Sequence, residues 1–292
     1  MERRIGSYLR PETLADALAL RAQGAKVLAG ATDFYPVRVG KPLHDRAATP
    51  ILDITGIEGI GAIRQQRDHW RIGAGARWTD IIGADLPPLF AALQQAACEV
   101  GGRQIQNRAT IGGNLVNASP AADGIPPLLA LDAKVELQSL AGLRTLTLAD
   151  FLLGPRRTAL ADGEILTAVI VPVPENGCEA RSAFIKFGAR ASLLISIVMV
   201  AGTVEVSAGR ISCARIAVGA CSPVARRLTD LEMDLAGRRL NADLAGVPEM
   251  RHLAPLSPID DIRADADYRR HAALILVQRL LLRVGTQAGS DA

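Results

Sequence analysis

The chain has 292 residues, of which 49% are hydrophobic, enough for a continuous core and for two domains of ordinary size. Lys and Arg (33) nearly balance Asp and Glu (30), which gives a net charge of +3, and aromatic residues make up only 3%. This balance and the few aromatic residues argue against a nucleic-acid-binding protein.

The cysteines and the apolar runs indicate where the chain works. Cys98, Cys178, Cys213 and Cys221 include no C-x-x-C pair, so we expect reduced thiols and no metal or iron–sulfur centre in this chain. No apolar run opens the sequence, and the longest ones are too short to cross a bilayer. We therefore expect a cytoplasmic protein without a membrane span.

The elements of the first part alternate between strands and helices. The amphipathic pattern of residues 11–21 predicts a helix, and Trp70 opens a run that alternates as a strand does. Further strands are expected over residues 26–29, 51–54, 134–138, 144–148 and 165–171, and further helices over residues 79–83 and 89–100. Residues 103–123 have little amphipathic period and predict a long loop, which in a compact domain is usually functional.

After a polar stretch that marks a domain boundary between residues 175 and 176, the pattern changes. Residues 183–187, 195–206 and 211–218 predict three strands, with Ala208 and Gly209 in the turn that joins the last two. The remainder is expected to be largely helical, because residues 268–284 carry an apolar stripe with helical spacing.

Two glycine-bearing loops can bind an anion. The first reads VLAGATDF over residues 27–34, and the second reads TIGGN over residues 110–114. Glycine permits close backbone approach, and consecutive N–H groups can form a concave anion nest, so two facing loops could hold a pyrophosphate. Neither loop contains Lys or Arg or matches the P-loop or Rossmann pattern. Binding would then rely on backbone dipoles, with Thr32 and Asn114 adding side-chain hydrogen bonds.

The second loop lies within a longer motif. Residues 101–123 read GGRQIQNRATIGGNLVNASPAAD. This segment resembles the flavin-binding segment R-Q-I-x-N-x-A/G-T-I-G-G-N-L-x-x-A-S-P-x-x-D of the medium subunits of carbon monoxide dehydrogenase, xanthine dehydrogenase and their relatives. The first loop resembles the A-G-G-T-D loop of that family, and residues 165–166 and 184–187 match in order and approximate spacing. The resemblance covers nearly the whole chain.

The resemblance implies an α+β fold in two parts. Residues 1–175 would form a two-part FAD-binding domain of the vanillyl-alcohol-oxidase-like type, with subdomains of about 1–60 and 61–175. Residues 176–292 would form a smaller α+β domain of the carbon monoxide dehydrogenase flavoprotein type, with a three-stranded antiparallel sheet and helices.

The resemblance also implies a set of cofactor-binding residues from the two loops, the ring contacts and the polar contacts. In that order they are Val27, Leu28, Ala29, Gly30, Ala31, Thr32, Asp33 and Phe34; Thr110, Ile111, Gly112, Gly113 and Asn114; Val100, Val116 and Leu166; and Asp123 and Lys186.

Two positions depart from the family pattern. Ala31 stands where the family often has a second glycine, and alanine disfavours a positive φ by about 1 kcal/mol. Residues 191–194 read ASLL where relatives often carry R-x-E-D, so no carboxylate there would tune a flavin. The pairs Arg156-Arg157 and Arg226-Arg227 are expected to be solvated or to contact other subunits.

The implied function is that of an FAD-binding electron-transfer subunit of a heteromeric molybdenum hydroxylase. A small partner would carry two [2Fe-2S] clusters, a large partner the molybdenum cofactor, and the complex would be a dimer of heterotrimers. This chain would pass electrons to an external acceptor and would contribute no catalytic acid or base. A stand-alone FAD-dependent oxidase and a flavin-free scaffold subunit are the alternatives. The sequence does not identify the substrate.

Overall fold

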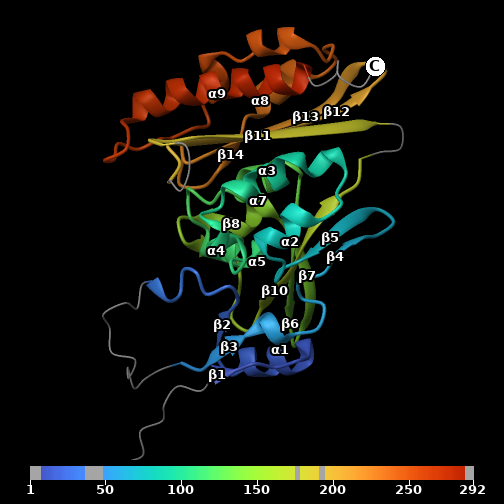
Figure 1. The fold of residues 1–292 in the computed structure, drawn as a ribbon, viewed down its shortest axis with the longest axis vertical. Coiled ribbons are helices and arrows are strands. Elements are labelled where there is room, and N and C mark those ends of the chain that lie inside the picture. Colours follow the sequence, from blue (N-terminus) through green and yellow to red (C-terminus); the bar gives the residue numbers. More distant parts are fainter. Residues whose placement is uncertain (1–7, 37–48, 175–177, 191–194, 287–292) are drawn as a thin grey trace, which may run out of the picture.

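A computed structural model of the chain describes residues 8–36, 49–174, 178–190 and 195–286. The elements form three units that follow one another along the long axis of the molecule (Figure 1). The N-terminal unit comprises the described residues up to 60, the second unit residues 61–174, and the C-terminal unit the described residues from 178 onward. The predicted boundary between residues 175 and 176 falls outside the described residues.

The N-terminal unit is a small parallel sheet with one helix. Strands β1 (Tyr8–Leu9), β3 (Ile51–Asp53) and β2 (Lys26–Leu28) pair in that order, and α1 (Leu14–Ala22) follows β1. Thr13 caps α1 by accepting a hydrogen bond from the Asp16 N–H at 3.2 Å, so the predicted helix begins later than expected. Because β2 and β3 run parallel, their carboxyl ends meet at the edge that faces the second unit.

The second unit is an antiparallel sheet covered by short helices. Its strands, in spatial order, are β4 (Ile63–Gln65), β5 (His69–Gly73), β10 (Ile165–Pro172), β6 (Lys134–Ser139) and β7 (Gly142–Thr147). Its helices are α2 (Trp78–Gly83), α3 (Ala91–Glu99), α4 (Arg103–Gln106), α5 (Ile111–Asn117), α6 (Ile125–Ala130) and α7 (Leu148–Phe151). A hairpin of β8 (Leu152–Gly154) and β9 (Arg157–Thr158) lies beside them. Central β10 is almost entirely buried, which its run of apolar residues predicts.

The long loop expected over residues 103–123 is wrong, because the segment contains α4 and α5. Helix α5 has the sequence IGGNLVN, whose two glycines hide any apolar stripe. Its N-terminus is nevertheless fixed by Thr110, which accepts a hydrogen bond from the Gly113 N–H at 3.1 Å. Ala118 ends the helix in the left-handed region with φ 45°.

The C-terminal unit is an antiparallel sheet covered by helices on its outer face (Figure 1). The predicted three-strand sheet has a fourth, two-residue strand: the order is β11 (Glu179–Phe187), β12 (Val198–Ser207), β13 (Arg210–Gly219), β14 (Arg226–Arg227). Ala208 and Gly209, with φ 51° and 71°, form the predicted turn. Helices α8 (Thr229–Leu235) and α9 (Ala266–Thr286), with short 3₁₀ turns between them, cover the sheet.

The second and C-terminal units are joined along α3 and β11. The Ala92 N–H donates to the Ser182 hydroxyl at 2.9 Å, and the Phe184 N–H donates to the Gln95 side-chain oxygen at 2.9 Å. Small buried alanines of α3 pack there against Phe184 and Met199. This seam fixes the two units relative to each other.

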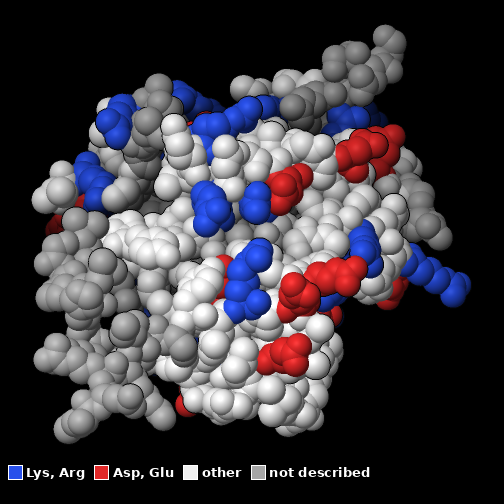
Figure 2. Space-filling model, turned by 60° about the horizontal axis from the view of Figure 1, so that its bottom comes forward, with Lys and Arg blue, Asp and Glu red and all other residues white. Residues whose placement is uncertain are grey.

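The surface of the N-terminal end carries both signs of charge. Figure 2 shows Lys and Arg side chains in small groups, with Asp and Glu interspersed among them. This mixture agrees with the nearly balanced composition. Among the described helices, none combines the length and the apolar character needed to cross a membrane.

Candidate cofactor site

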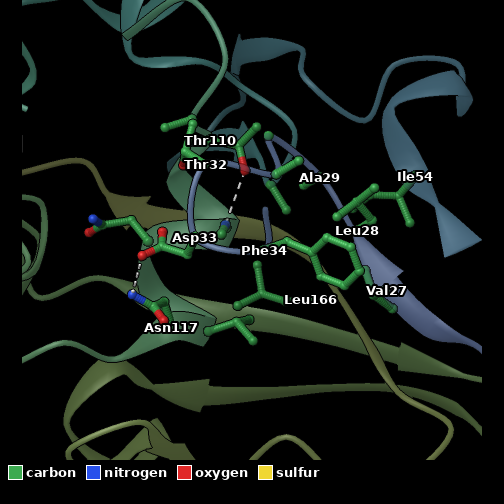
Figure 3. A pocket seen from close by; sticks show the side chains of 18 of the residues that line it. Val27, Leu28, Ala29, Thr32, Asp33, Phe34, Ile54, Thr110, Asn117 and Leu166 are labelled. Atoms are coloured by element: carbon green, nitrogen blue, oxygen red, sulfur yellow. Dashed lines mark hydrogen bonds between the residues drawn. The ribbon is translucent and has the colours of Figure 1, made fainter. Parts of the chain in front are cut away.

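A cavity of about 450 Å³ lies between the N-terminal unit and the second unit (Figure 3). One wall is formed by β2 and the loop after it, and the other by α5, β10 and the β8–β9 hairpin. All of the predicted cofactor-binding residues line this cavity except Ile111, Asp123 and Lys186. The two loops singled out in the sequence therefore share one site, although about 80 positions separate them along the chain.

The two loops touch at Gly30. A Cβ atom at this position would overlap the carbonyl oxygen of Arg108 and would lie 2.7 Å from the Cα of Ala109. The residue has to be glycine because the backbone of the first loop passes directly against the chain that leads into Thr110. The contact at Gly30 therefore holds the first loop against the segment that precedes the second loop.

The first loop, residues 27–34, presents unused backbone donors. Among the described residues, none accepts a hydrogen bond from the N–H groups of residues 30–33. Ala31 has φ 63°, and a left-handed residue within such a run turns successive N–H groups toward one concave side. The first loop therefore has the form of an anion nest, and it adopts the strained conformation at Ala31 despite the side chain.

The second loop, residues 110–114, behaves differently from the prediction. The Ile111 N–H donates to the Ala76 oxygen and the Gly112 N–H to the Ala74 oxygen, both at 2.9 Å, while the Gly113 N–H is capped by Thr110. These donors are used inside the protein, so the expectation of a second nest is wrong. Ile111 is fully buried in the core. The second loop therefore forms part of the cavity wall without offering free N–H donors to a ligand.

One polar atom of that wall has no partner. The Asn114 side-chain oxygen is buried and accepts no hydrogen bond from the residues that the structure describes. This oxygen is turned toward Gly124, where an added Cβ atom would lie 2.9 Å from it, and not toward the open cavity. Farther along α5, the Asn117 side-chain nitrogen donates to the Asp33 carboxylate at 3.3 Å and ties the helix to the first loop (Figure 3).

The rest of the lining is largely apolar. Val100, Val116 and Leu166 line the cavity together with Phe34 and Leu160, a surface suited to planar rings. Two cations that the sequence reasoning missed also line it, Lys26 and Arg156. The Lys26 Nζ lies 5.6 Å from the centre of the Phe34 ring. Both cations lie outside the two loops, and no local motif marks them.

Asp123 and Lys186 form a separate buried ion pair between the second and C-terminal units. Their charged atoms are 2.9 Å apart, and their side chains are only 11% and 5% exposed. The Lys186 Nζ also donates to the Glu99 oxygen at 3.2 Å, and the Ser196 hydroxyl donates to Asp123 at 3.4 Å. Burial raises the pKa of Asp123 to about 6, although the attraction of Lys186 opposes this shift.

A second cavity of about 670 Å³ is lined by sequence neighbours of the residues that contact this ion pair. Its described lining includes Gly101, just beyond Glu99, and Ile195 and Ile197 on either side of Ser196. Ile105 lines both cavities. The residues at 191–194, where the family motif R-x-E-D would stand, lie outside the described residues.

The comparisons place this two-domain α+β chain in a family. The model of the FAD binding domain in molybdopterin dehydrogenase matches residues 3–174, and that of the CO dehydrogenase flavoprotein C-terminal domain matches residues 183–284. The chain belongs to the family of FAD-binding subunits of molybdenum hydroxylases, as its sequence motifs predict. It is the flavoprotein component of an oxidoreductase, and FAD is the cofactor of its family.

Similar proteins extend over the whole chain. The xanthine dehydrogenase FAD-binding subunit of Escherichia coli O157:H7 is 31% identical over 287 residues, which cover 97% of both chains. The nicotine 6-hydroxylase medium subunit of Paenarthrobacter nicotinovorans is 32% identical over 291 residues, again with 97% of both chains covered. A chain of reconstituted CO dehydrogenase from Oligotropha carboxidovorans has a TM-score of 0.83 at 27% identity and is covered over 99% of its length, against 98% of this chain.

Proposed function

We propose that this chain holds one FAD in the cavity between its first two units and serves as the electron-transfer subunit of a molybdenum hydroxylase. Electrons would arrive from two [2Fe-2S] clusters of a small subunit and leave to an external acceptor, while a large subunit with the molybdenum cofactor oxidises the substrate. When bound, the flavin supplies the redox chemistry, and the chain supplies position and electrostatics. The unused donors of residues 30–33 in a chain of this family carry the proposal.

The lining fits a dinucleotide in two respects. The nest at residues 30–33 offers N–H groups to a pyrophosphate. Val100, Val116 and Leu166 offer apolar surface to the rings. The expected contacts from Asp123 and Lys186 stay a prediction, because neither residue is in the described lining of the first or the second cavity.

We infer the finer organisation from the family as well. The FAD-binding domain would be of the vanillyl-alcohol-oxidase-like type and span residues 1–175, with subdomains of about 1–60 and 61–175, and residues 176–292 would form the second domain. The division of the described residues into three units supports this (Figure 1). A cytoplasmic dimer of heterotrimers would be the working assembly.

The contact at Gly30 gives a direct test. Gly30→Ala places a methyl group on the Arg108 carbonyl oxygen, so we expect the purified complex to lose most of its FAD. Gly83→Ala is the matched control, because a Cβ at Gly83 meets no atom within 4 Å. Flavin released by denaturation of equal amounts of each complex is measured by fluorescence and by mass.

The wild-type complex decides between the alternatives. A fully active complex whose chain carries no flavin would refute the proposal and favour a scaffold role. Oxidation of the substrate by the isolated chain, without its partners, would favour a stand-alone oxidase. The described lining of the first cavity contains no His or Tyr that could serve as an acid or base in such an oxidase.

A further inference from the structure

Arg156 lies at the tip of the β8–β9 hairpin, where it lines the first cavity. Its backbone N–H donates to the Ala118 oxygen at 2.9 Å, and Ala118 is the residue that ends α5. The hairpin tip is therefore fixed to the C-terminal end of the same helix whose N-terminus forms the second loop.

This end of the helix is also where the anion nest is attached. Asn117, next to Ala118, donates to Asp33, the last residue of the nest. One hydrogen bond thus ties the nest to Asn117, and a second ties the next residue, Ala118, to Arg156. The arginine side chain therefore starts from the helix end to which the nest is tied. Its guanidinium has no ion pair with the side chains that the structure describes.

The backbone at Arg156 is unusual for an arginine. Its φ of 57° lies in the left-handed region, which glycine or asparagine adopts with less strain. Strained residues of this kind concentrate at ligand sites. Arg157, the next residue, has the same charge but belongs to β9 and does not line the cavity. The sequence pair Arg156-Arg157 therefore contains two different environments.

We infer that Arg156 binds a phosphate oxygen of the dinucleotide held by the nest. The nest offers only neutral N–H groups, and the Asp33 carboxylate beside it repels an anion. The other cation of the lining, Lys26, lies over the Phe34 ring, so a doubly charged pyrophosphate needs a further balancing charge. A guanidinium supplies that charge, and its planar fork matches phosphate oxygens in a bidentate arrangement. The inference rests on the proposed function, because it takes FAD as the ligand of the cavity.

The test is titration of FAD into the flavin-stripped full-length chain, followed by quenching of flavin fluorescence at low and high salt. We expect Arg156→Gln to weaken binding by about tenfold to a hundredfold, the usual size of a charge-assisted hydrogen bond, and to reduce its dependence on salt. Arg156→Lys keeps the charge but lacks the planar guanidinium, so its FAD affinity should lie between those of wild type and Arg156→Gln. Arg157→Gln, the matched control, should stay within about twofold of wild type.

A second variant separates binding from folding. Arg156→Gly removes the side chain and also relieves the left-handed backbone, so it should raise the thermal midpoint of the apoprotein while weakening FAD binding. Wild-type affinity and salt dependence in Arg156→Gln, or equal losses in Arg156→Gln and Arg157→Gln, would overturn the assignment. A wild-type chain that does not bind FAD at all would instead overturn the proposed function.

Discussion

At the scale of single residues, several strained backbone conformations lie at or next to the first cavity. Among the described residues, six other than glycine have a positive φ. Of these, Ala31 and Arg156 line the cavity, and the Ala118 oxygen at the end of α5 accepts a hydrogen bond from the Arg156 N–H. Each costs on the order of 1–2 kcal/mol relative to an unstrained conformation. The surrounding contacts hold these residues in place, and the first loop gains a concave row of donors from the strain at Ala31.

Replacing Ala31 by glycine removes its strain. We expect Ala31→Gly to stabilise the apoprotein by about 0.5–1 kcal/mol, because glycine adopts a positive φ freely. Urea unfolding measures the change. Ala29→Gly, two residues earlier and without a positive φ, should instead cost about 0.5–1 kcal/mol through the entropy of the unfolded chain. Equal effects of the two substitutions would show that the backbone at Ala31 is not strained.

At the scale of the secondary-structure element, helix α5 is ordered by hydrogen bonds at its N-terminus. Its glycine-rich sequence predicts a turn, and its N-terminal donors were expected to face a ligand. In the structure the cap at Thr110 and the carbonyls of Ala74 and Ala76 take these donors, which orders a seven-residue helix that propensity alone would not support.

Removal of the cap tests this account. Thr110→Ala leaves the Gly113 N–H without its acceptor, so we expect a loss of about 1 kcal/mol in the free energy of unfolding. Thr110→Ser keeps the hydroxyl and should recover most of it. The measurement is urea unfolding of the apoprotein, and an alanine variant as stable as the serine variant would contradict the role of the cap.

The elements show what a single sequence can and cannot predict. Strong patterns, such as buried β10 and the long α9, were predicted with errors of a few residues. Helix α6 was missed because all of its residues are buried and two of them are prolines, which leaves no apolar stripe. Strand β14 is two residues long and exists only because β13 offers an edge.

In the candidate site, too, the residues with a clear sequence motif were predicted and those without one were not. The two loops carry recognisable motifs, and the structure brings them together at Gly30. Lys26 and Arg156 were missed because a strand and a hairpin deliver them to the cavity from outside those motifs. The sequence also does not show which of the two loops keeps free N–H donors. The donors of the second loop are taken by the carbonyls of Ala74 and Ala76, which lie far away in the sequence.

At the scale of the whole molecule, the ion pair of Asp123 and Lys186 joins two units. Burial raises the pKa of Asp123 to about 6, whereas an unfolded aspartate titrates near about 3.9. Between these values the folded state binds more protons than the unfolded chain, so stability falls as the pH rises from about 4 to about 6. Below this window the carboxyl is protonated in both states and contributes nothing.

Substitutions of the pair should change this pH profile in opposite ways. Asp123→Asn removes the titrating group, so its contribution to the slope between about pH 4 and 6 should disappear. Lys186→Met leaves the carboxyl buried without its cation, which raises its pKa further and extends the loss of stability toward higher pH. Urea unfolding at a series of pH values measures both. An Asp123→Asn profile identical to that of wild type would refute the assignment.

The first cavity has walls from two units that also contact each other directly. Arg21 donates to the Glu164 oxygen at 3.0 Å, Asp33 accepts from Asn117, and Ile165 joins the core of the N-terminal unit. A ligand between the two units contacts both of them. By mass action, a higher ligand concentration therefore favours the state in which the two units are associated. We therefore expect bound cofactor to slow proteolysis of the N-terminal unit, so that chains without cofactor are degraded sooner than chains that hold it.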